Sequence, residues 1–447
     1  MAYSHTLIFL LRLLHRSHIP CLLILLLLLL RGPVNRSTTL INRVLEHGST
    51  SIYTADRETS KTWSVHNHTS SYHTSDYHTL IRFPPVKHNE NINDFTFDNV
   101  HLYPCTQPQG PAPGEVEDLM CLSRPDYLSG YKNPCYLDET KHLQCLPYYF
   151  ILGFGKCATT DLTSRLQAHP AILKNHGKFD KETFYWSWRR FGFLLRKVIK
   201  PFTLAEYTTF FTNATNAIAP LEGQPNQPIV GDGSPCDGWD FRGWTRDPQN
   251  VGLSEPKVLA PQHMRHIMKE PKFIFLMREP TERLYSDYFF HNIGDSPEKF
   301  AKDAARAVDM MNACMRENTT RQCFYSFDLH RSLPGFIHAG CYSLFLREWL
   351  SEFHRKHFLF LRTEDYEKDM KGNLRAVFSF LGVDTLSDSM LDSIVKQNRR
   401  LQNDKKKTAG PMFEETRKLL QEFYAPCNQD LADLFGDDRY LWLDRHH

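Results

Sequence analysis

An expected strand, a glycine-containing loop and a helix follow one another over residues 148–169, and this unit constrains the fold more than any other stretch. Residues 148–152 form a short aromatic and β-branched run that is typical of a buried strand. Gly153 and Gly155 allow a tight turn, and the Thr-Thr-Asp run at 159–161 supplies residues that cap helices. Such a unit aims loop amides and the positive end of a helix at one point, where a phosphate or sulfate can bind.

The side chains of this loop favour an anion site that differs from the phosphate-binding loop of nucleoside triphosphatases. Lys156 adds a mobile cation, and Thr159 and Thr160 add hydroxyl donors. The loop of nucleoside triphosphatases, G-x-x-x-x-G-K-[ST], fits poorly, because one residue separates the two glycines here and Cys157 follows the lysine. A purely structural turn with a solvated lysine is the alternative interpretation.

Later apolar runs predict the fold class. Short candidate strands lie at 228–230, 272–277 and 358–361, and helical sequence separates them. Residues 342–353 repeat apolar side chains every three and four positions, as in a helix that packs on a core. We therefore expect an α/β fold with a central parallel sheet and helices on both faces. Ligands of such sheets bind beyond the carboxyl ends of the strands, where the loop at 153–160 would lie.

A second stretch is expected to end on the same edge. Arg278 follows the candidate strand at 272–277, Pro280 suits the first turn of a helix, and Ser286 comes two helical turns later. The guanidinium of Arg278 and the hydroxyl of Ser286 are therefore candidates for a second phosphate. The alternative is that Arg278 pairs with a local carboxylate and Ser286 is merely exposed.

The region before this domain divides into three parts. Arg12 and Arg16 precede an apolar run at 19–30, so residues 1–30 are expected to form a cytosolic tail and an uncleaved signal anchor, with a cleaved signal peptide as the alternative. Residues 31–100 are rich in Ser, Thr, His and Asn and predict a largely disordered stem. Residues 101–147 are expected to form a cysteine-rich lead-in that is held together by disulfides rather than by a packed core. Residues 148–447 are expected to form the main domain.

Cysteine spacing and sequons indicate an oxidising compartment. The chain has 11 cysteines, and none shows C-x-x-C or zinc-finger spacing, so disulfides fit better than a metal site. The lead-in holds Cys105, Cys121, Cys135 and Cys145, whose three pairings the sequence leaves open. Candidate glycosylation sites are Asn35, Asn67, Asn213 and Asn318. The net charge of +2 does not by itself indicate a partner, and no nucleic acid is expected.

The two motifs together resemble the cofactor signature of sulfotransferases that use 3′-phosphoadenosine 5′-phosphosulfate (PAPS). The loop GFGKCATTDL is similar to the 5′-phosphosulfate loop of that family, and REPTERLYSDY to its 3′-phosphate motif. The likeness covers roughly the last 300 residues, from about residue 133 onward, and is greatest to Golgi carbohydrate sulfotransferases acting on N-acetylgalactosamine 4-sulfate in chondroitin. The stem and the expected anchor resemble nothing specific.

The resemblance implies roles for individual residues. It makes Glu182, in the segment KETFYW, the general base that takes a proton from a sugar hydroxyl. It makes Lys156 the residue that stabilises the negative charge that develops during in-line sulfuryl transfer. By this interpretation the reaction needs no metal. It also implies a disulfide between Cys314 and Cys323, and we further expect one between Cys341 and Cys427. The implied cofactor-binding residues are Gly155, Lys156, Cys157, Ala158, Thr159, Thr160, Arg278, Ser286, Lys405, Lys406, Lys407 and Thr408.

The chain departs from the family pattern at two places. Gly155 and Ala158 stand where the chondroitin enzymes resemble P-K-C-G-T-T, and Gly233 stands where heparan sulfate sulfotransferases carry a second catalytic lysine. The second departure argues against a heparan acceptor. Cysteine 157 is expected to be a small loop residue rather than a nucleophile.

The expected acceptor is chondroitin or dermatan sulfate, and the expected location is the Golgi membrane as a single-pass type II protein, or secretion after signal cleavage. A polyanionic acceptor requires cations, for which two clusters are candidates. Another glycan acceptor such as heparan sulfate, or a non-catalytic polyanion-binding role, remains as an alternative. The clusters are Arg189, Arg190, Arg196, Lys197 and Lys200, and Arg399, Arg400 and Lys405 to Lys407.

Overall fold

A computed structural model describes residues 80–83, 103–194, 197–398 and 404–443. The expected signal anchor and nearly all of the expected stem lie outside the described residues, as do Asn35 and Asn67. Within the described ranges, no helix is both long and apolar enough to cross a membrane.

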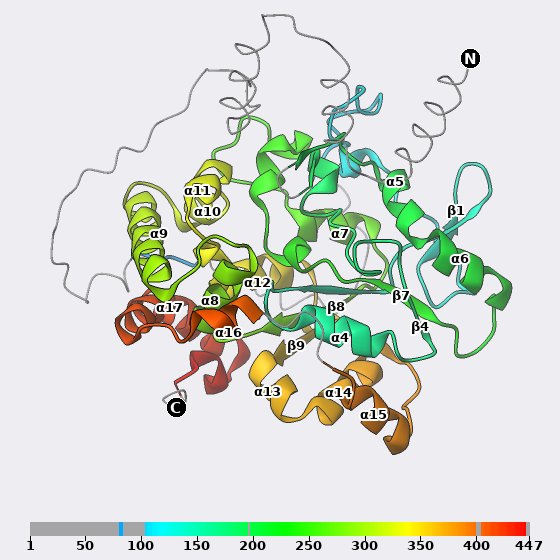
Figure 1. The fold of residues 1–447 in the computed structure, drawn as a ribbon. Coiled ribbons are helices and arrows are strands. Elements are labelled where there is room, and N and C mark those ends of the chain that lie inside the picture. Colours follow the sequence, from blue (N-terminus) through cyan, green and yellow to red (C-terminus); the bar gives the residue numbers. More distant parts are fainter. Residues whose placement is uncertain (1–79, 84–102, 195–196, 399–403, 444–447) are drawn as a thin grey trace, which may run out of the picture. The chain divides into compact units, whose positions relative to one another are not determined.

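Five parallel strands form the central sheet, in the order β4-β7-β3-β8-β9 (Figure 1). The three later candidate strands and the first one are all present, so the predicted parallel sheet is confirmed. The two-residue strand β4 was missed, because two apolar residues show no period. The strands are β3 (Tyr149–Gly153), β4 (Ile172–Leu173), β7 (Ile229–Asp232), β8 (Lys272–Met277) and β9 (Phe358–Arg362).

Helices cover both faces of this sheet (Figure 1). On one face, Arg165 of α4 (Thr159–Leu166) donates to the carbonyl of Val395 in α15 (Asp388–Val395) at 3.2 Å, and His169 packs on Phe378 of α14 (Met370–Leu381). On the other, Trp349 of α12 (Tyr342–Glu352) lies 5.0 Å from the ring centroid of Phe273 in β8. Because both faces are covered, all five residues of β3 are buried.

The remaining elements complete the layers around the sheet. The predicted helix at 342–353 is confirmed as α12. Two antiparallel strand pairs lie outside the sheet, β1 (Cys135–Leu137) with β2 (Leu143–Cys145) and β5 (Phe193–Leu194) with β6 (Lys197–Val198). The other helices are α5 (Leu204–Thr208), α6 (Thr212–Ile218), α7 (Ala260–Ile267), α8 (Pro280–Phe290), α9 (Pro297–Glu317), α10 (Thr320–Phe324), α11 (Phe327–Ser332), α13 (Thr363–Lys368), α16 (Asp404–Ala409) and α17 (Glu414–Phe435).

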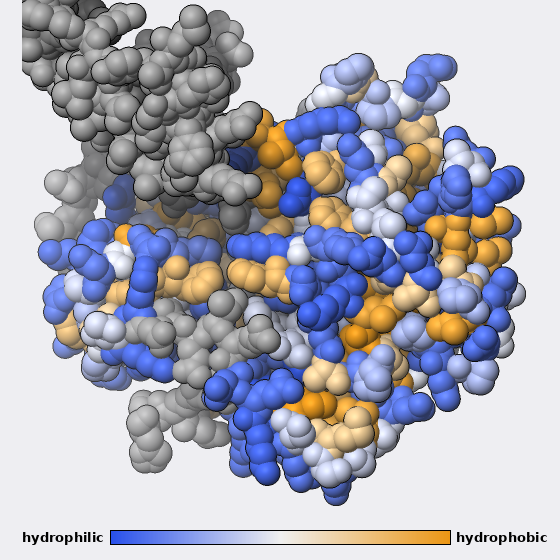
Figure 2. All heavy atoms as spheres, turned by 45° about the vertical axis from the view of Figure 1, so that its right-hand side comes forward, coloured by the Kyte–Doolittle hydropathy of each residue, from blue (hydrophilic) through white to orange (hydrophobic). Residues whose placement is uncertain are grey.

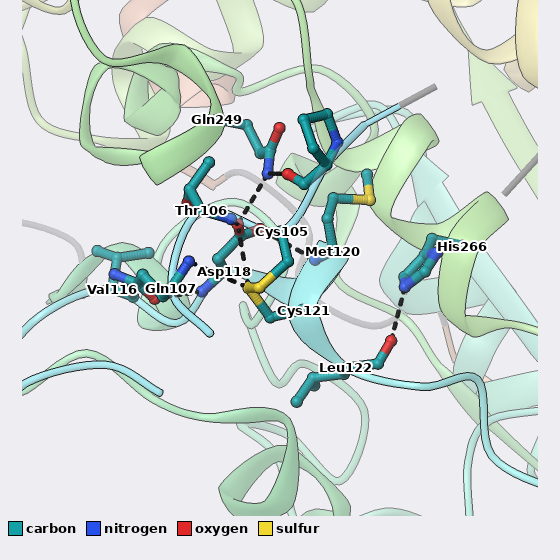
Figure 3. The surroundings of a disulfide bond; sticks show 11 residues. Cys105, Thr106, Gln107, Val116, Asp118, Met120, Cys121, Leu122, Gln249 and His266 are labelled. Atoms are coloured by element: carbon teal, nitrogen blue, oxygen red, sulfur yellow. Dashed lines mark hydrogen bonds between the residues drawn. A yellow bond between two sulfur atoms is a disulfide. The ribbon is translucent and has the colours of Figure 1, made fainter. Parts of the chain in front are cut away.

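Disulfides hold the cysteine-rich lead-in together, as expected. The lead-in also packs into the main hydrophobic core, which was not expected. Leu119 and Leu146 are fully buried and belong to the main hydrophobic core. Asp118 accepts hydrogen bonds from the Oγ1 of Thr106 and the Nε2 of Gln249, both at 2.7 Å, beside the Cys105–Cys121 disulfide (Figure 3). This packing could not be predicted from the sequence, because these apolar residues are spread between prolines and show no regular period.

Four disulfides link eight of the described cysteines, and Cys157 and Cys236 are free and buried. The expected pairs Cys314–Cys323 and Cys341–Cys427 are both present, and the second joins the start of α12 to α17. In the lead-in, neighbours along the chain pair with each other, which resolves the three possible pairings. The four disulfides are Cys105–Cys121, Cys135–Cys145, Cys314–Cys323 and Cys341–Cys427.

The surface is mainly hydrophilic on the face drawn in Figure 2, where apolar side chains gather in separate groups. Asn213, in α6, and Asn318, at the end of α9, are both exposed, as a glycosylation site must be. Their modification stays a prediction.

Candidate active site

The sheet order places a topological switch point between the neighbouring strands β3 and β8, where sheets of this kind form a ligand crevice. From β3 the chain continues to β4 on one side of the sheet, whereas from β8 it continues to β9 on the other. The loops after β3 and β8 therefore separate at their carboxyl ends, which is where parallel sheets of this kind bind ligands. Both stretches singled out in the sequence, the loop at 153–160 and the segment that begins at Arg278, start at this crevice.

The loop after β3 exposes backbone donors in a way that differs from the expectation. The left-handed residues are Lys156 (φ 68°) and Ala158 (φ 62°), not the two glycines. Ala158 is also the N-cap of α4 and offers no side-chain cap, so the expected capping by the threonines is wrong. In the described part of the chain, the amides of Lys156, Ala158, Thr159 and Thr160 have no hydrogen-bond acceptor outside α4 itself. An oxyanion would satisfy these donors.

Gly155 leaves room for such a ligand. A Cβ atom placed on this glycine would meet no heavy atom within 4 Å, so open space lies beside the loop backbone. Gly153 is required for the opposite reason, because a Cβ there would lie 2.6 Å from the Cδ1 atom of Phe275 in β8. The two glycines thus serve close strand packing and ligand access rather than a left-handed turn.

Lys156 lies beside the carboxyl end of α8. Its Nζ atom is 3.5 Å from the ring centroid of Phe290, a cation–π contact. Burial lowers the pKa of Lys156 to about 8, with the nearby Asp287 raising it and Arg278 lowering it. The charge of Arg278 thus acts on Lys156, so the structure brings the two motifs together at one end of the crevice.

Cys157 connects the loop to the neighbouring strand. It is fully buried, and its Sγ atom lies 3.9 Å from the hydroxyl of Tyr342, which donates to the carbonyl of Arg278 at 2.7 Å. Burial raises the pKa of the Cys157 thiol to about 12. A thiol that stays protonated is a poor nucleophile, in agreement with its expected role as a small loop residue.

The second motif begins a well-capped helix. Pro280 is the first residue of α8, as predicted, and Glu279 caps the helix by accepting from the amides of Thr281 and Glu282. Arg278 does contact a local carboxylate, because its Nη2 atom lies 3.5 Å from the Oε2 atom of Glu282. Ser286 is buried on α8 rather than exposed. The contact with Glu282 agrees with the alternative interpretation of Arg278, whereas the burial of Ser286 contradicts the expectation that it is merely exposed. The binding roles of both residues stay predictions.

The lysine cluster at 405–407 lies on α16, which packs on α8. Lys405 contacts the side chain of Asn292, and the Nζ atom of Lys406 is 2.5 Å from Glu282. Lys407 and Thr408 lie on the same short helix. These contacts place the cluster beside the Arg278 motif, whereas Arg399 and Arg400 lie outside the described residues.

Glu182 lies at the carboxyl end of β7, two strands from β8. Its neighbour Lys181 pairs with the Glu182 carboxylate and donates to the carbonyl of Gly233 at 3.0 Å, immediately beyond β7. The amide of Gly233 in turn donates to the carbonyl of Lys181 at 2.8 Å. Glu182 thus stands at the same edge of the sheet as Lys156, and its side chain is 11% exposed.

A buried carboxylate at the end of β7 stabilises the segment that contains Glu182 through hydrogen bonds. Asp232, the last residue of β7, accepts from Thr183 Oγ1 at 2.5 Å, Ser234 Oγ at 2.6 Å and Tyr207 OH at 2.9 Å. Burial raises the pKa of Asp232. The turn before Glu182 has left-handed backbone at Phe179 and Asp180, both with φ 57°. Hydrogen bonds from β7 therefore fix a backbone conformation that is unfavourable by itself.

The basic cluster at 189–200 differs in part from the sequence-based prediction. Arg190 is fully buried and pairs with Asp247 at 3.2 Å, so it is a structural residue and not an acceptor cation. Arg189 is half-buried and donates to the carbonyl of Thr183 at 2.7 Å. Lys197 and Lys200 are exposed, and Arg196 lies outside the described residues. The alternation of charge and aromatic side chains in this run concealed which arginine turns inward.

Sequence reasoning did not single out Lys181 and Asp232, which hold the segment of Glu182, or Arg417, which contacts the Arg278 motif. Lys181 and Asp232 show their importance only through contacts between the turn at 178–183 and β7. Arg417, in α17, pairs with Glu282 at 2.7 Å across 135 positions of the chain. Within the described ranges, no group of three or more His, Cys, Asp or Glu residues could hold a metal ion.

Comparison with known proteins places the chain in a family. The sequence profile of the sulfotransferase domain matches residues 146–418. Carbohydrate sulfotransferase 15 of Mus musculus is 34% identical over 68% of the chain, and that of Homo sapiens is 32% identical over 67%. The chain spans 56% and 55% of these two relatives, about half their length.

A solved structure gives a weaker likeness. The sulfotransferase from Alicyclobacillus acidocaldarius is 19% identical and has a TM-score of 0.40, covering 66% of the chain and 97% of that protein. At these values the likeness adds nothing to the family assignment made from the sequence.

Proposed function

The chain belongs to the sulfotransferase domain family, and on this premise we propose that it transfers a sulfuryl group from PAPS to a hydroxyl of a glycosaminoglycan. The preferred position in this proposal is O-6 of N-acetylgalactosamine 4-sulfate in chondroitin or dermatan sulfate. The match over residues 146–418 carries the reaction class. The names of the mouse and human relatives support a carbohydrate acceptor, and the likeness of the motifs supports the choice of sugar.

The residues at the crevice fit a nucleotide with two anionic groups. The open space at Gly155 and the amides of residues 156–160 suit a phosphosulfate next to Lys156. Arg278, just before α8, and Ser286, within α8, suit a second phosphate. PAPS has such groups at its 5′ and 3′ positions and supplies an activated sulfuryl group. A loop with uncapped amides and a cation suits the first of these groups.

The proposed reaction is a direct in-line displacement. Glu182 takes the proton from the acceptor hydroxyl while the hydroxyl oxygen forms its bond to sulfur. Lys156 and the loop amides stabilise the negative charge that develops on the departing phosphate oxygen. Lys181 keeps the Glu182 carboxylate in place through the ion pair between them. The catalytic groups thus act by positioning and by charge.

The proposed location is the lumen of the Golgi, with the chain held by a single N-terminal span. The four disulfides of the described part support an oxidising compartment. The apolar run at 19–30 after Arg12 and Arg16 supports a type II orientation. Secretion after signal cleavage is the other outcome, and N-terminal sequencing of the cellular protein distinguishes the two.

The acceptor is tested with radiolabelled PAPS and a panel of glycans. Chondroitin, 4-sulfated chondroitin, dermatan sulfate and heparan sulfate are each incubated with the full chain, and the products are digested to disaccharides. We expect label on position 6 of 4-sulfated N-acetylgalactosamine. Label on heparan sulfate alone would overturn the acceptor and keep the reaction, whereas no label on any glycan would overturn the proposed function.

A further inference from the structure

Two guanidinium groups from distant elements share one carboxylate at the start of α8. Arg278, directly after β8, lies 3.5 Å from the Oε2 atom of Glu282. Arg417, on the first turn of α17, lies 2.7 Å from the Oε1 atom of the same residue. Lys406 of α16 adds a third cation at 2.5 Å. Three separate elements therefore bring positive charge to one point.

In the described part of the chain, Arg278, Lys406 and Arg417 all form ion pairs with the single carboxylate of Glu282. Glu282 is the shared partner, and Glu414, 3.9 Å from the Nε atom of Arg417, is 76% exposed. Burial raises the pKa of Glu282, but Lys406, Arg417 and Arg278 together lower it to about 2. Arg278 and Arg417 also keep 23% of their side chains exposed, so an incoming anion can reach both. A phosphate monoester, with nearly two negative charges, would interact favourably with both guanidinium groups.

The cluster faces the same side of α8 as Ser286. Glu282 and Ser286 are four residues apart, so their side chains lie one above the other on the helix. Arg417 meets the Glu282 end of this row, and Tyr285 donates to the carbonyl of Gly410, the residue between α16 and α17 that directly follows α16, at 2.9 Å. The first turn of α17 is thus held against the expected phosphate motif.

We propose that Arg417 binds the 3′-phosphate of the nucleotide together with Arg278, an inference that rests on the proposed function. Arg417 lies outside both motifs that the sequence singles out. Glu282 keeps the two guanidinium groups close together before the nucleotide arrives, and the phosphate then receives hydrogen bonds from both. A guanidinium fork suits this task better than an ammonium, because it can donate two parallel hydrogen bonds to one phosphate.

Isothermal titration of the full chain tests this role with two nucleotides. Adenosine 3′,5′-bisphosphate carries the 3′-phosphate, and adenosine 5′-monophosphate lacks it. We expect Arg417→Gln to weaken binding of the bisphosphate at least about tenfold, as for loss of a charged hydrogen bond, and to leave the monophosphate within about twofold. Arg417→Lys, which keeps the charge and loses the fork, should give a smaller loss of the same selectivity.

Lys418→Gln is the matched control, because this neighbouring cation is exposed and should change neither affinity. Equal losses for both nucleotides in Arg417→Gln, or no loss for either, would overturn the role of Arg417. Unchanged monophosphate binding shows that the variant is folded. If the unaltered chain does not prefer the bisphosphate, the proposed function itself fails, and the inference fails with it.

Discussion

The proposed nucleotide side and the proposed acceptor side of the candidate site are built in different ways. On the nucleotide side, Lys156 and Arg278 stand on loops that directly follow β3 and β8, and the side chain of Arg278 stays 23% exposed. On the acceptor side, Glu182 is 11% exposed, paired with Lys181, and carried by a turn with left-handed residues. One side presents charge from ordinary strand–loop–helix units, and the other fixes a single carboxylate through buried hydrogen bonds.

This difference shows where binding and chemistry are expected to separate. Changes on the nucleotide side should alter affinity and turnover together, because the same cations hold the ligand and stabilise its developing charge. Changes on the acceptor side should alter turnover with little effect on nucleotide affinity. The following predictions test that separation.

Replacing Lys156 should have the largest effect on the nucleotide side. Lys156→Met removes the ammonium and keeps the volume of the aliphatic chain, so we expect kcat/KM to fall by about 10²- to 10³-fold, as for loss of one preorganised charge. Nucleotide affinity should fall as well. Steady-state transfer assays and titration with adenosine 3′,5′-bisphosphate measure both quantities. A large loss of kcat/KM with unchanged nucleotide affinity would assign Lys156 to the acceptor side instead.

Replacing Asp232 should damage the acceptor side alone. Asp232→Asn keeps the shape but presents amide hydrogens to hydroxyls that now donate to a carboxylate, so we expect kcat to fall at least about tenfold and stability to fall by about 1–3 kcal/mol. Nucleotide affinity should stay unchanged. Asp138→Asn is the control, because Asp138 also accepts several side-chain hydrogen bonds but lies in the lead-in. An equal loss of kcat in both variants would contradict a specific role for Asp232.

The pH dependence of nucleotide binding should reveal Lys156. Its pKa is lowered to about 8, and an anionic ligand favours the protonated form, so affinity should fall as pH rises through 8. Between pH 7 and 9 we expect roughly a tenfold loss, since each pKa unit corresponds to tenfold in affinity. Lys156→Arg stays charged over this range and should give a flat profile. A flat profile in the unaltered chain would show that Lys156 does not contact the ligand as an ammonium.

The smallest expected effect concerns the turn before Glu182. Lys178 contacts the exposed ring of Phe179 beside this turn, so it is placed to meet a polyanionic acceptor. Lys178→Glu should raise the acceptor KM about two- to fivefold and weaken the dependence of KM on salt, as for one exposed charge. Lys141→Glu, an exposed lysine of the lead-in, should leave KM unchanged. The same shift of the acceptor KM in both variants would show that overall charge, and not the position of Lys178, causes the effect.

The nucleotide side was largely predictable because its signals are local. A strand, a loop and a helix occupy consecutive residues, so Lys156 and Arg278 could be placed at strand ends from the sequence. Even here, the left-handed residues proved to be Lys156 and Ala158, although alanine at positive φ is costly. Helix capping was also predicted at the wrong residues, because the threonines lie inside α4.

The acceptor side was not predictable, because its contacts join residues far apart in the chain. Thr183 and Asp232 meet across 49 positions, and on the nucleotide side the contact between Arg417 and Glu282, across 135 positions, was missed for the same reason. The inward turn of Arg190 depends on Asp247, which no short motif reveals. The choice of acceptor and of the sulfated position depends on contacts with the acceptor itself. The sequence indicates the proposed glycosaminoglycan and position only through the resemblance of its motifs.

The most direct test of the account compares the unaltered chain with Glu182→Gln in transfer of radiolabelled sulfate from PAPS to 4-sulfated chondroitin, with nucleotide affinity measured on the same samples. The account predicts that Glu182→Gln lowers transfer at least about 10²-fold, as for loss of a general base, while the affinity for adenosine 3′,5′-bisphosphate stays within about twofold. Transfer at the unaltered rate in Glu182→Gln would contradict the assignment of Glu182 and, with it, the division of the site into a nucleotide side and an acceptor side.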